Sequence, residues 1–242
     1  DKLLPLYREL LEALARLGVT EVQIHDPALV LSDASAFRDD VERAYAGLAG
    51  SGVRMNLVTY FDDLGEAYPW VVNLPVDLIT LDFTRGEALS LIEKYGWPAG
   101  KVLAAGVVDG RSIWRVRPGT AQGILNRLKA LSAFRDPGTL RLSASSSLQH
   151  VPHSAARETA LPEALRNVLA FADEKLTELA MLAGGDLASA EAAWAAFEAF
   201  APDDEAVRAR VAVLIADDFR RAHPYDERRP QQVALPCLPM TT

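Results

Sequence analysis

Short hydrophobic runs alternate with amphipathic segments through most of the chain. Apolar residues spaced three and four apart are typical of helices, and short apolar runs between turn residues are typical of buried strands. Helices are predicted over 2–17, 35–49, 64–72, 87–95 and 119–134, and strands over 19–25, 53–61, 76–83, 101–109 and 140–147. This alternation favours βαβ units and therefore a parallel sheet.

Beyond residue 160 the pattern changes to long segments rich in Ala, Leu and Glu, with no strand between them. Helices are predicted over 160–183, 187–200 and 203–221. The tail, 225–242, loses this periodicity and contains three prolines, so it is predicted to be a linker. We therefore expect a domain over 1–224 and a linker over 225–242.

The right-handed crossover rule leaves two main arrangements for such a sheet, an open doubly wound sheet and a closed barrel. No Gly-x-Gly-x-x-Gly follows a predicted strand, so the dinucleotide fingerprint of the open class is missing. Several strands instead end in polar residues, namely Asp26, Thr59, Asp82, Asp109 and Ser145 to Ser147. Polar strand ends that converge on one mouth favour an incomplete (β/α)8 barrel of the TIM type, with about five βα units and extra C-terminal helices. We expect the three remaining strands to come from an upstream segment.

Composition narrows the possible partners. The formal net charge of −8 argues against nucleic acid, because affinity for phosphate backbones depends on clustered Lys and Arg. No run approaches the ~20 apolar residues that span a bilayer, so no membrane partner is expected. The single cysteine, Cys237, excludes an internal disulfide framework and a multi-cysteine zinc cluster, and it fits a cytoplasmic location.

Four charged residues close to predicted strand ends are candidates for substrate binding. Asp26 and Asp82 could form a carboxylate pair for acid–base work or bind a cation, and hydrogen bonding within the fold is the alternative. Gly110 permits a tight turn, after which Arg111 and Arg115 could hold a carboxylate by bidentate hydrogen bonds. An intradomain salt bridge is the alternative for these two arginines.

Histidines and serines give weaker signals. His25 lies on a predicted strand, and His150 and His153 follow the last strand with a spacing that resembles a ligand pair. Pro152 lies between them and no third ligand is near in sequence, so zinc is not expected there. The run Ser145 to Ser147 lacks a Gly-x-Ser-x-Gly elbow, so no nucleophilic triad is expected. We assign no catalytic residue and no metal ligand.

Several short motifs occur in one order along the chain. They are Gln23-Ile24, Pro27-Ala28-Leu29, Thr59-Tyr60-Phe61, Gly106, Gly110-Arg111, Trp114-Arg115, Ser145 to Leu148, His150, Leu235-Pro236, Pro239 and Thr241-Thr242. As an ordered set they resemble the N-terminal half of the cobalamin-independent methionine synthase family. One departure is His25-Asp26, where the family usually has Asp-Glu before the proline.

The resemblance implies two (β/α)8 barrels that move a methyl group from 5-methyltetrahydrofolate polyglutamate to homocysteine, which makes methionine. It implies that this chain is part of the N-terminal, non-catalytic barrel and supports the interdomain folate cleft. Its expected partners are the C-terminal catalytic barrel and the upstream barrel strands. The tail then becomes an interdomain linker, and the isolated chain is expected to be inactive.

The resemblance also implies where the cofactor and substrates bind. Zinc is expected only in the C-terminal barrel, where a His-x-Cys pair, a Glu and a second Cys hold it, and no cofactor is expected in this segment. At the corresponding places this chain has Thr59-Tyr60-Phe61 and the serine run. The family's basic residues for the folate polyglutamate lie upstream of this segment, and its homocysteine contacts follow it.

Two other functions remain open on the residues alone. One is a stand-alone binding or structural barrel without methyl transfer. The other is a metal-independent barrel enzyme, related to the uroporphyrinogen decarboxylase type, that uses Asp26 or Asp82 with arginines that hold the carboxylates of its substrate.

Overall fold

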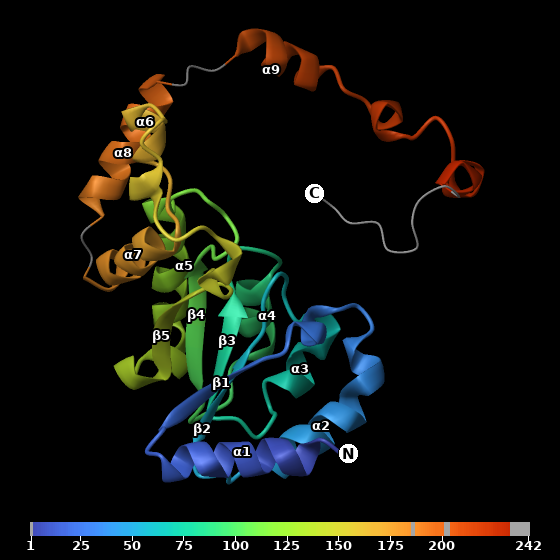
Figure 1. Ribbon diagram of the computed structural model, residues 1–242, viewed down its shortest axis with the longest axis vertical. Helices are drawn as coiled ribbons and strands as arrows, with labels where there is room; N and C mark the ends of the chain where they lie inside the picture. The colour runs from blue at the N-terminus through green and yellow to red at the C-terminus, as the bar shows by residue number, and fades with distance from the viewer. Residues whose placement is uncertain (1, 185–186, 201–203, 233–242) are drawn as a thin grey trace. The chain divides into compact units, whose positions relative to one another are not determined.

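Five parallel strands lie side by side in the order in which the chain makes them (Figure 1). They are β1 (Glu21–His25), β2 (Arg54–Val58), β3 (Leu78–Asp82), β4 (Val102–Val108) and β5 (Leu140–Ala144). The structure is a computed structural model that describes residues 2–184, 187–200 and 204–232. The chain divides into two compact units, Asp1–Phe200 and Ala201–Thr242, and the sheet belongs to the first. The expected division between a domain over 1–224 and a linker remains a prediction.

The strand order confirms the predicted barrel class. A doubly wound sheet reverses its strand order at a switch point, whereas this sheet adds each new strand on the same side of the last. Helices connect or flank the strands: α1 (Leu4–Arg16), α2 (Arg38–Leu48), α3 (Tyr68–Val71), α4 (Ala88–Tyr95), α5 (Pro118–Ala130) and α7 (Ala172–Gly184). All four strand pairs are parallel, as βαβ units require. The unit is therefore an incomplete (β/α)8 barrel of the TIM type.

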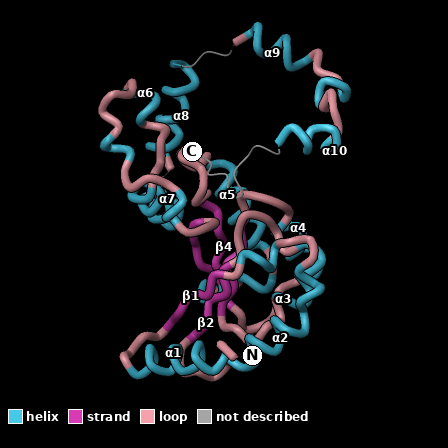
Figure 2. Tube along the Cα trace, turned by 45° about the vertical axis from the view of Figure 1, so that its right-hand side comes forward, coloured by secondary structure: helices cyan, strands magenta, loops and turns pink. Residues whose placement is uncertain are grey.

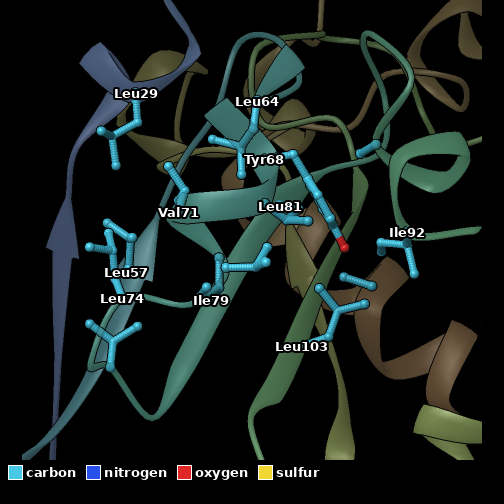
Figure 3. Packing of buried hydrophobic residues seen from close by; sticks show 14 of the residues in the cluster. Leu29, Leu57, Leu64, Tyr68, Val71, Leu74, Ile79, Leu81, Ile92 and Leu103 are labelled. Atoms are coloured by element: carbon cyan, nitrogen blue, oxygen red, sulfur yellow. The ribbon is translucent and has the colours of Figure 1, made fainter. Parts of the chain in front are cut away.

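The hydrophobic core lies between the outer face of the sheet and these helices. Alternate strand residues such as Leu57, Ile79 and Leu103 are fully buried on this face, and Figure 3 shows them opposite Val71 and Tyr68. Figures 1 and 2 both place α3 and α4 on the same side of the strands. Because strand side chains alternate between faces, the other residues of each strand point to the inner face.

The inner face is more polar than the outer face. Thr80 on β3 donates a hydrogen bond of 3.0 Å to the amide oxygen of Asn56 on β2, and both residues are buried. Gly106 on β4 is needed for close packing, since a Cβ there would lie 2.6 Å from the Cα of Ser145. The sheet therefore has the packed, partly polar interior that belongs to a small barrel.

The helix predicted over 160–183 is wrong as a single element. The structure has a short helix, α6 (Glu163–Arg166), then an extended segment, and only then α7. Leu169 in this segment forms an antiparallel bridge with Trp114, and the N–H of Arg115 donates to the carbonyl of Val168 at 2.8 Å. Tertiary backbone pairing overrides helix propensity here, and it ties this segment to the loop after β4.

The later helices fit the sequence pattern only in part. The helix α8 (Ala188–Phe200) confirms the prediction over 187–200. The prediction over 203–221 is wrong as one helix, because α9 (Glu205–Ala212) is followed by a separate 3-10 turn, Ala216–Phe219. The β-branched run Val211, Val213 and Ile215 lowers helix propensity at this break. In the tail, α10 (Tyr225–Arg228) and a 3-10 turn (Arg229–Gln232) are formed, and residues 233–242 lie outside the described part. No helix in the described part is both long and apolar enough to cross a bilayer.

Candidate binding site at the carboxyl ends of the strands

Most of the polar residues predicted at strand ends lie along the carboxyl edge of the sheet. Parallel strands in register carry their C-terminal ends to the same edge, where ligands bind in barrels of this type. Asp82 is the last residue of β3 and pairs in register with Gly106 of β4. Asp26 and Asp109 each follow directly after a strand. We call this edge the mouth of the sheet.

Asp26 lies half-buried just beyond β1. The hydroxyl of Tyr45 on α2 donates to its carboxylate at 3.3 Å, and its backbone N–H donates to the carbonyl of Val58. Burial raises the pKa of Asp26, and the hydrogen bond from Tyr45 opposes this rise. Asp26 thus fastens the end of β1 to β2 and α2.

Asp82 is nearly fully buried, and its carboxylate accepts three hydrogen bonds. One oxygen accepts from the N–H and the hydroxyl of Thr84, both at 2.7 Å, and the other accepts from the N–H of Phe61 at 3.2 Å. Burial raises the pKa of Asp82, while these bonds lower it and the charge of Asp109 raises it. Among neighbouring charges, that of Asp109 acts on Asp82, and no hydrogen bond between described residues joins Asp82 to Asp26, so the proposed carboxylate pair stays a prediction.

Phe61 has an unusual backbone and central contacts. Its φ of 83° makes it the one non-glycine residue of the described part in the left-handed region. Tyr60 packs against its ring with centroids 4.5 Å apart, and His150 from the loop after β5 lies 5.3 Å away. The guanidinium carbon of Arg111, in the loop after β4, lies 4.3 Å from the ring centroid. No separate role for Phe61 can be predicted from the sequence, because neither its backbone angle nor these contacts leave a local sequence signal.

Arg115 lies in a different environment from Arg111. Its side chain is 21% exposed and its Nε lies 4.0 Å from Glu178 on α7, which is the intradomain partner expected as the alternative. Glu178 is buried and accepts from the N–H of Val116 at 2.9 Å. Burial raises the pKa of Glu178, whereas this bond and the charges of Lys175 and Arg115 lower it. Lys175 is also fully buried and donates to the carbonyl of Trp114 at 3.2 Å.

Arg115 also lines a cavity of about 280 Å³ at the ends of β3 and β4. Its polar lining includes Thr84, Asp109, Ser112, Arg115 and Thr120. The cavity is small and already faces an arginine that has an acidic neighbour. Arg111, by contrast, is exposed at the mouth, and its side chain makes no ion pair within the described part.

The serine run shapes the mouth through backbone contacts. Ser145 is buried and its hydroxyl accepts from the N–H of Gly110 at 3.2 Å. A Cβ at Gly110 would lie 2.6 Å from the carbonyl oxygen of Ser146, so only glycine fits between these loops. Among the described residues, no hydrogen bond joins these hydroxyls to a histidine or an acid.

The three histidines of the first unit do not converge. His25 contacts Gln23 and the edge of Tyr60, His150 contacts the Tyr60–Phe61 pair, and His153 lies 3.4 Å from Asp173. Among the described residues, no group of three or more His, Cys, Asp or Glu side chains could hold a metal ion. After β2 the chain places a hydroxyl and two aromatic rings, which do not suit zinc, since that metal prefers thiolate and imidazole ligands.

The mouth can therefore bind an anion better than it can perform acid–base chemistry. Asp26, Asp82 and Asp109 accept hydrogen bonds from the fold, and the exposed Arg111 is held on an aromatic ring.

Comparisons with known proteins agree with this architecture. The sequence model of the N-terminal domain of cobalamin-independent synthase matches residues 1–133. The chain is 51% identical to the 5-methyltetrahydropteroyltriglutamate–homocysteine methyltransferase of Synechococcus sp. (strain JA-2-3B'a(2-13)) over 250 residues. It is 46% identical to the protein of the same name from Trichodesmium erythraeum (strain IMS101) and 38% identical to that from Streptomyces avermitilis.

These three alignments include all of this chain but only 32%, 33% and 33% of the relatives. The chain thus spans about a third of the length of the curated relatives it matches. The family match covers the region from α1 through β4 and α5, and the relatives extend the similarity through β5 and the later helices. Because the family model matches more than half of the 242 residues, the chain belongs to the cobalamin-independent methionine synthase family.

Proposed function

We propose that this chain is part of the N-terminal barrel of a methyltransferase. The intact enzyme would transfer a methyl group from 5-methyltetrahydropteroyltriglutamate to homocysteine, as the names of the relatives state. The main support for this proposal is the sequence identity of 51% to the Synechococcus relative over the whole chain. The sequential five-stranded sheet with a polar mouth supports the same assignment, because ligands of such barrels bind at this edge.

In this proposal the chain contributes structure and binding surface, and the chemistry takes place elsewhere. Its mouth would support the interdomain folate cleft, with Asp26, Asp82, Arg111 and Arg115 as the substrate-binding candidates. Its partners would be a C-terminal catalytic barrel and the upstream strands that complete its own barrel. Zinc would be held by that second barrel, in agreement with the poor zinc ligands after β2. We also propose a cytoplasmic location.

The two outer strands support the proposed upstream partner. β1 and β5 each pair with one neighbour, so each leaves one edge open within the described part. An open strand edge carries unpaired backbone groups that a further strand can pair with. Large apolar side chains also remain exposed on α1, at Leu6, Tyr7 and Leu10, and at its flanking residues Leu3 and Leu17. A further βα unit would cover both features.

A segment exchange tests this function. The matching third of the Synechococcus relative is replaced by this chain, and methionine formation from homocysteine and the triglutamate methyl donor is measured. We expect the chimera to retain activity and this chain alone to have none. A chimera that is folded, as judged by circular dichroism and thermal melting, but inactive would contradict the proposal.

A further inference from the structure

Three strand ends meet on the ring of Phe61. Phe61 itself follows β2, Arg111 comes from the loop after β4, and His150 comes from the loop after β5. These loops are far apart in sequence and join different strands. The half-buried ring of Phe61 therefore contacts loops from two other strands at the mouth.

The ring is held in place by a buried acid. Asp82 at the end of β3 accepts the N–H of Phe61, and the same carboxylate is fixed by Thr84. The left-handed φ of 83° costs energy for a residue that has a Cβ, so it persists only because the surroundings impose it. Strained non-glycine residues of this kind cluster at binding and active sites.

Arg111 is held by this ring and keeps its hydrogen-bonding edge free. The guanidinium lies over the face of Phe61, which is a cation–π contact and reduces the entropy that the side chain loses when it binds. The carboxylate of Asp109 accepts the backbone N–H of Arg111 and lies 3.5 Å from Arg85. Asp109 is thus occupied by another arginine, and the Arg111 donors point to no acid among the described residues.

A guanidinium in this setting matches one ligand chemistry. Its planar donors fit both oxygens of a carboxylate, and the exposed imidazole of His150 offers a further N–H donor beside the same ring. The methyl donor named for the relatives carries a chain of glutamyl residues, so it presents several carboxylates. Free inorganic anions would meet the same donors, but only a chain of several carboxylates can place separate ones on Arg111 and on His150.

We propose that Arg111 and His150, mounted on Phe61, form a subsite for glutamyl carboxylates of the methyl donor. This subsite rests on the proposed function and adds a contact that the family resemblance does not imply, because the family's basic polyglutamate residues lie upstream of this segment. Arg115 is not part of it, because its Nε lies 4.0 Å from the buried Glu178 and its backbone N–H is bonded to Val168, so it does not rest on Phe61.

Binding of the isolated glutamyl tail tests the subsite on the whole 242-residue chain. The probe is γ-linked triglutamate, titrated by isothermal calorimetry and by amide shifts in NMR. The variant Arg111→Met should weaken binding by about tenfold or more, and His150→Ala by about threefold. The matched control is Arg117→Met, because Arg117 also lies over an aromatic ring, that of Trp194 at 4.0 Å, but is paired with Glu198. This control should bind the tail as the unchanged chain does.

Several outcomes would overturn the subsite. They are unchanged tail binding in Arg111→Met, equal loss in Arg117→Met, and equally tight binding of inorganic phosphate or of an amidated tail without carboxylates. Near-UV circular dichroism of each variant shows whether the fold is intact. An active segment-exchange chimera with no tail binding rejects the subsite and keeps the proposed function. Tail binding that depends on Arg111, together with an inactive folded chimera, rejects the proposed function and keeps the subsite for glutamyl carboxylates.

Discussion

Glu21 at the start of β1 and Arg141 on β5 are hydrogen-bonded, although they belong to the two outer strands of the sheet. One guanidinium nitrogen of Arg141 lies 2.8 and 3.0 Å from the two oxygens of Glu21. In a flat sheet, four spacings of about 4.8 Å would hold these strands about 19 Å apart, which is beyond the reach of the two side chains. The sheet must therefore curve as a barrel wall does, and this ion pair spans its concave side.

Removal of the ion pair between Arg141 and Glu21 should lower the stability of the chain slightly. The side chains of Arg141 and Glu21 are 44% and 25% exposed, so solvent weakens the attraction. We expect Arg141→Met to lower the free energy of unfolding by about 1 kcal/mol or less, and this loss should shrink in high salt. Urea unfolding at low and high salt measures it. The pair Arg127–Glu93, which joins α5 and α4, is the matched control for an exposed ion pair that does not span the sheet.

Gly106 should tolerate no side chain. A Cβ there would lie 2.6 Å from the Cα of Ser145 and 2.7 Å from the carbonyl oxygen of Leu81, and backbone atoms cannot move aside cheaply. We expect Gly106→Ala to destabilise the chain by about 2 kcal/mol or more, as overpacked core positions do. Gly123 in α5 has open space around it, so Gly123→Ala should instead stabilise by about 0.5–1 kcal/mol. Thermal melts of both variants give the comparison, and a neutral Gly106→Ala would contradict this packing.

The class of the fold follows from the sequence because it depends on repeated local signals. The hydrophobic runs of the five strands and the polar residues at their ends are visible without a structure, and the strand order confirms what they predict. The failure over 160–183 has a tertiary cause. Val168 to Ala170 read as part of a helix, but the backbone of this segment pairs with Ile113 and Arg115, which are far away in sequence.

The candidate site can be predicted from the sequence only in part, because its main contacts also join segments that are far apart in the chain. Asp82 and Arg111 were identified by their position after strands, and both do lie at the mouth. The sequence shows Phe61 only as part of the motif Thr59-Tyr60-Phe61, because its role depends on a backbone angle and on contacts with distant loops. Likewise, nothing local distinguishes Arg115 from Arg111, although Glu178 restrains only the former.

Asp82 should make the unfolding free energy depend on pH. Burial raises its pKa in the folded chain, so the folded state binds more protons than the unfolded state just above the ordinary carboxyl range. Stability contributed by this group therefore falls as the pH rises through that range. Asp82→Asn removes the titration, and its pH profile should lack this fall. The difference between the two profiles isolates Asp82 from Asp26 and Glu178, whose pKa values are raised in the same direction. Parallel profiles would contradict the prediction.

Lys101 should produce the opposite slope at alkaline pH. Its Nζ donates to the carbonyls of Val72 and Leu74 at 2.7 and 2.6 Å, and burial lowers the pKa of Lys101 from 10.5 to about 8. Between these values the unfolded chain binds more protons, so stability rises with pH. Urea unfolding from pH 7 to about 9.5 should show this rise in the unchanged chain and not in Lys101→Met. The range stops there because burial also raises the pKa of Tyr45 and of Tyr68, and ionisation of unfolded tyrosines near pH 10 then reverses the slope.

Phe61 offers a direct measure of backbone strain at the mouth. Phe61→Ala and Phe61→Gly both remove the ring and its contacts with Arg111 and His150, so they differ mainly in the Cβ at a φ of 83°. At ordinary positions alanine is the more stable of the two, because glycine loses more entropy on folding. Here we expect glycine to be more stable by about 1 kcal/mol, since the left-handed region penalises a Cβ.

Phe83 is the matched position for this comparison, because it follows β3 as Phe61 follows the end of β2 and has no positive φ. Phe83→Ala should be more stable than Phe83→Gly, the reverse of the order at Phe61. The free energies of unfolding of the four variants, measured in urea, decide the matter. The same order at both positions would mean that Asp82 and the surrounding loops impose no strain on Phe61, and the preformed ring on which Arg111 rests would lose its physical basis.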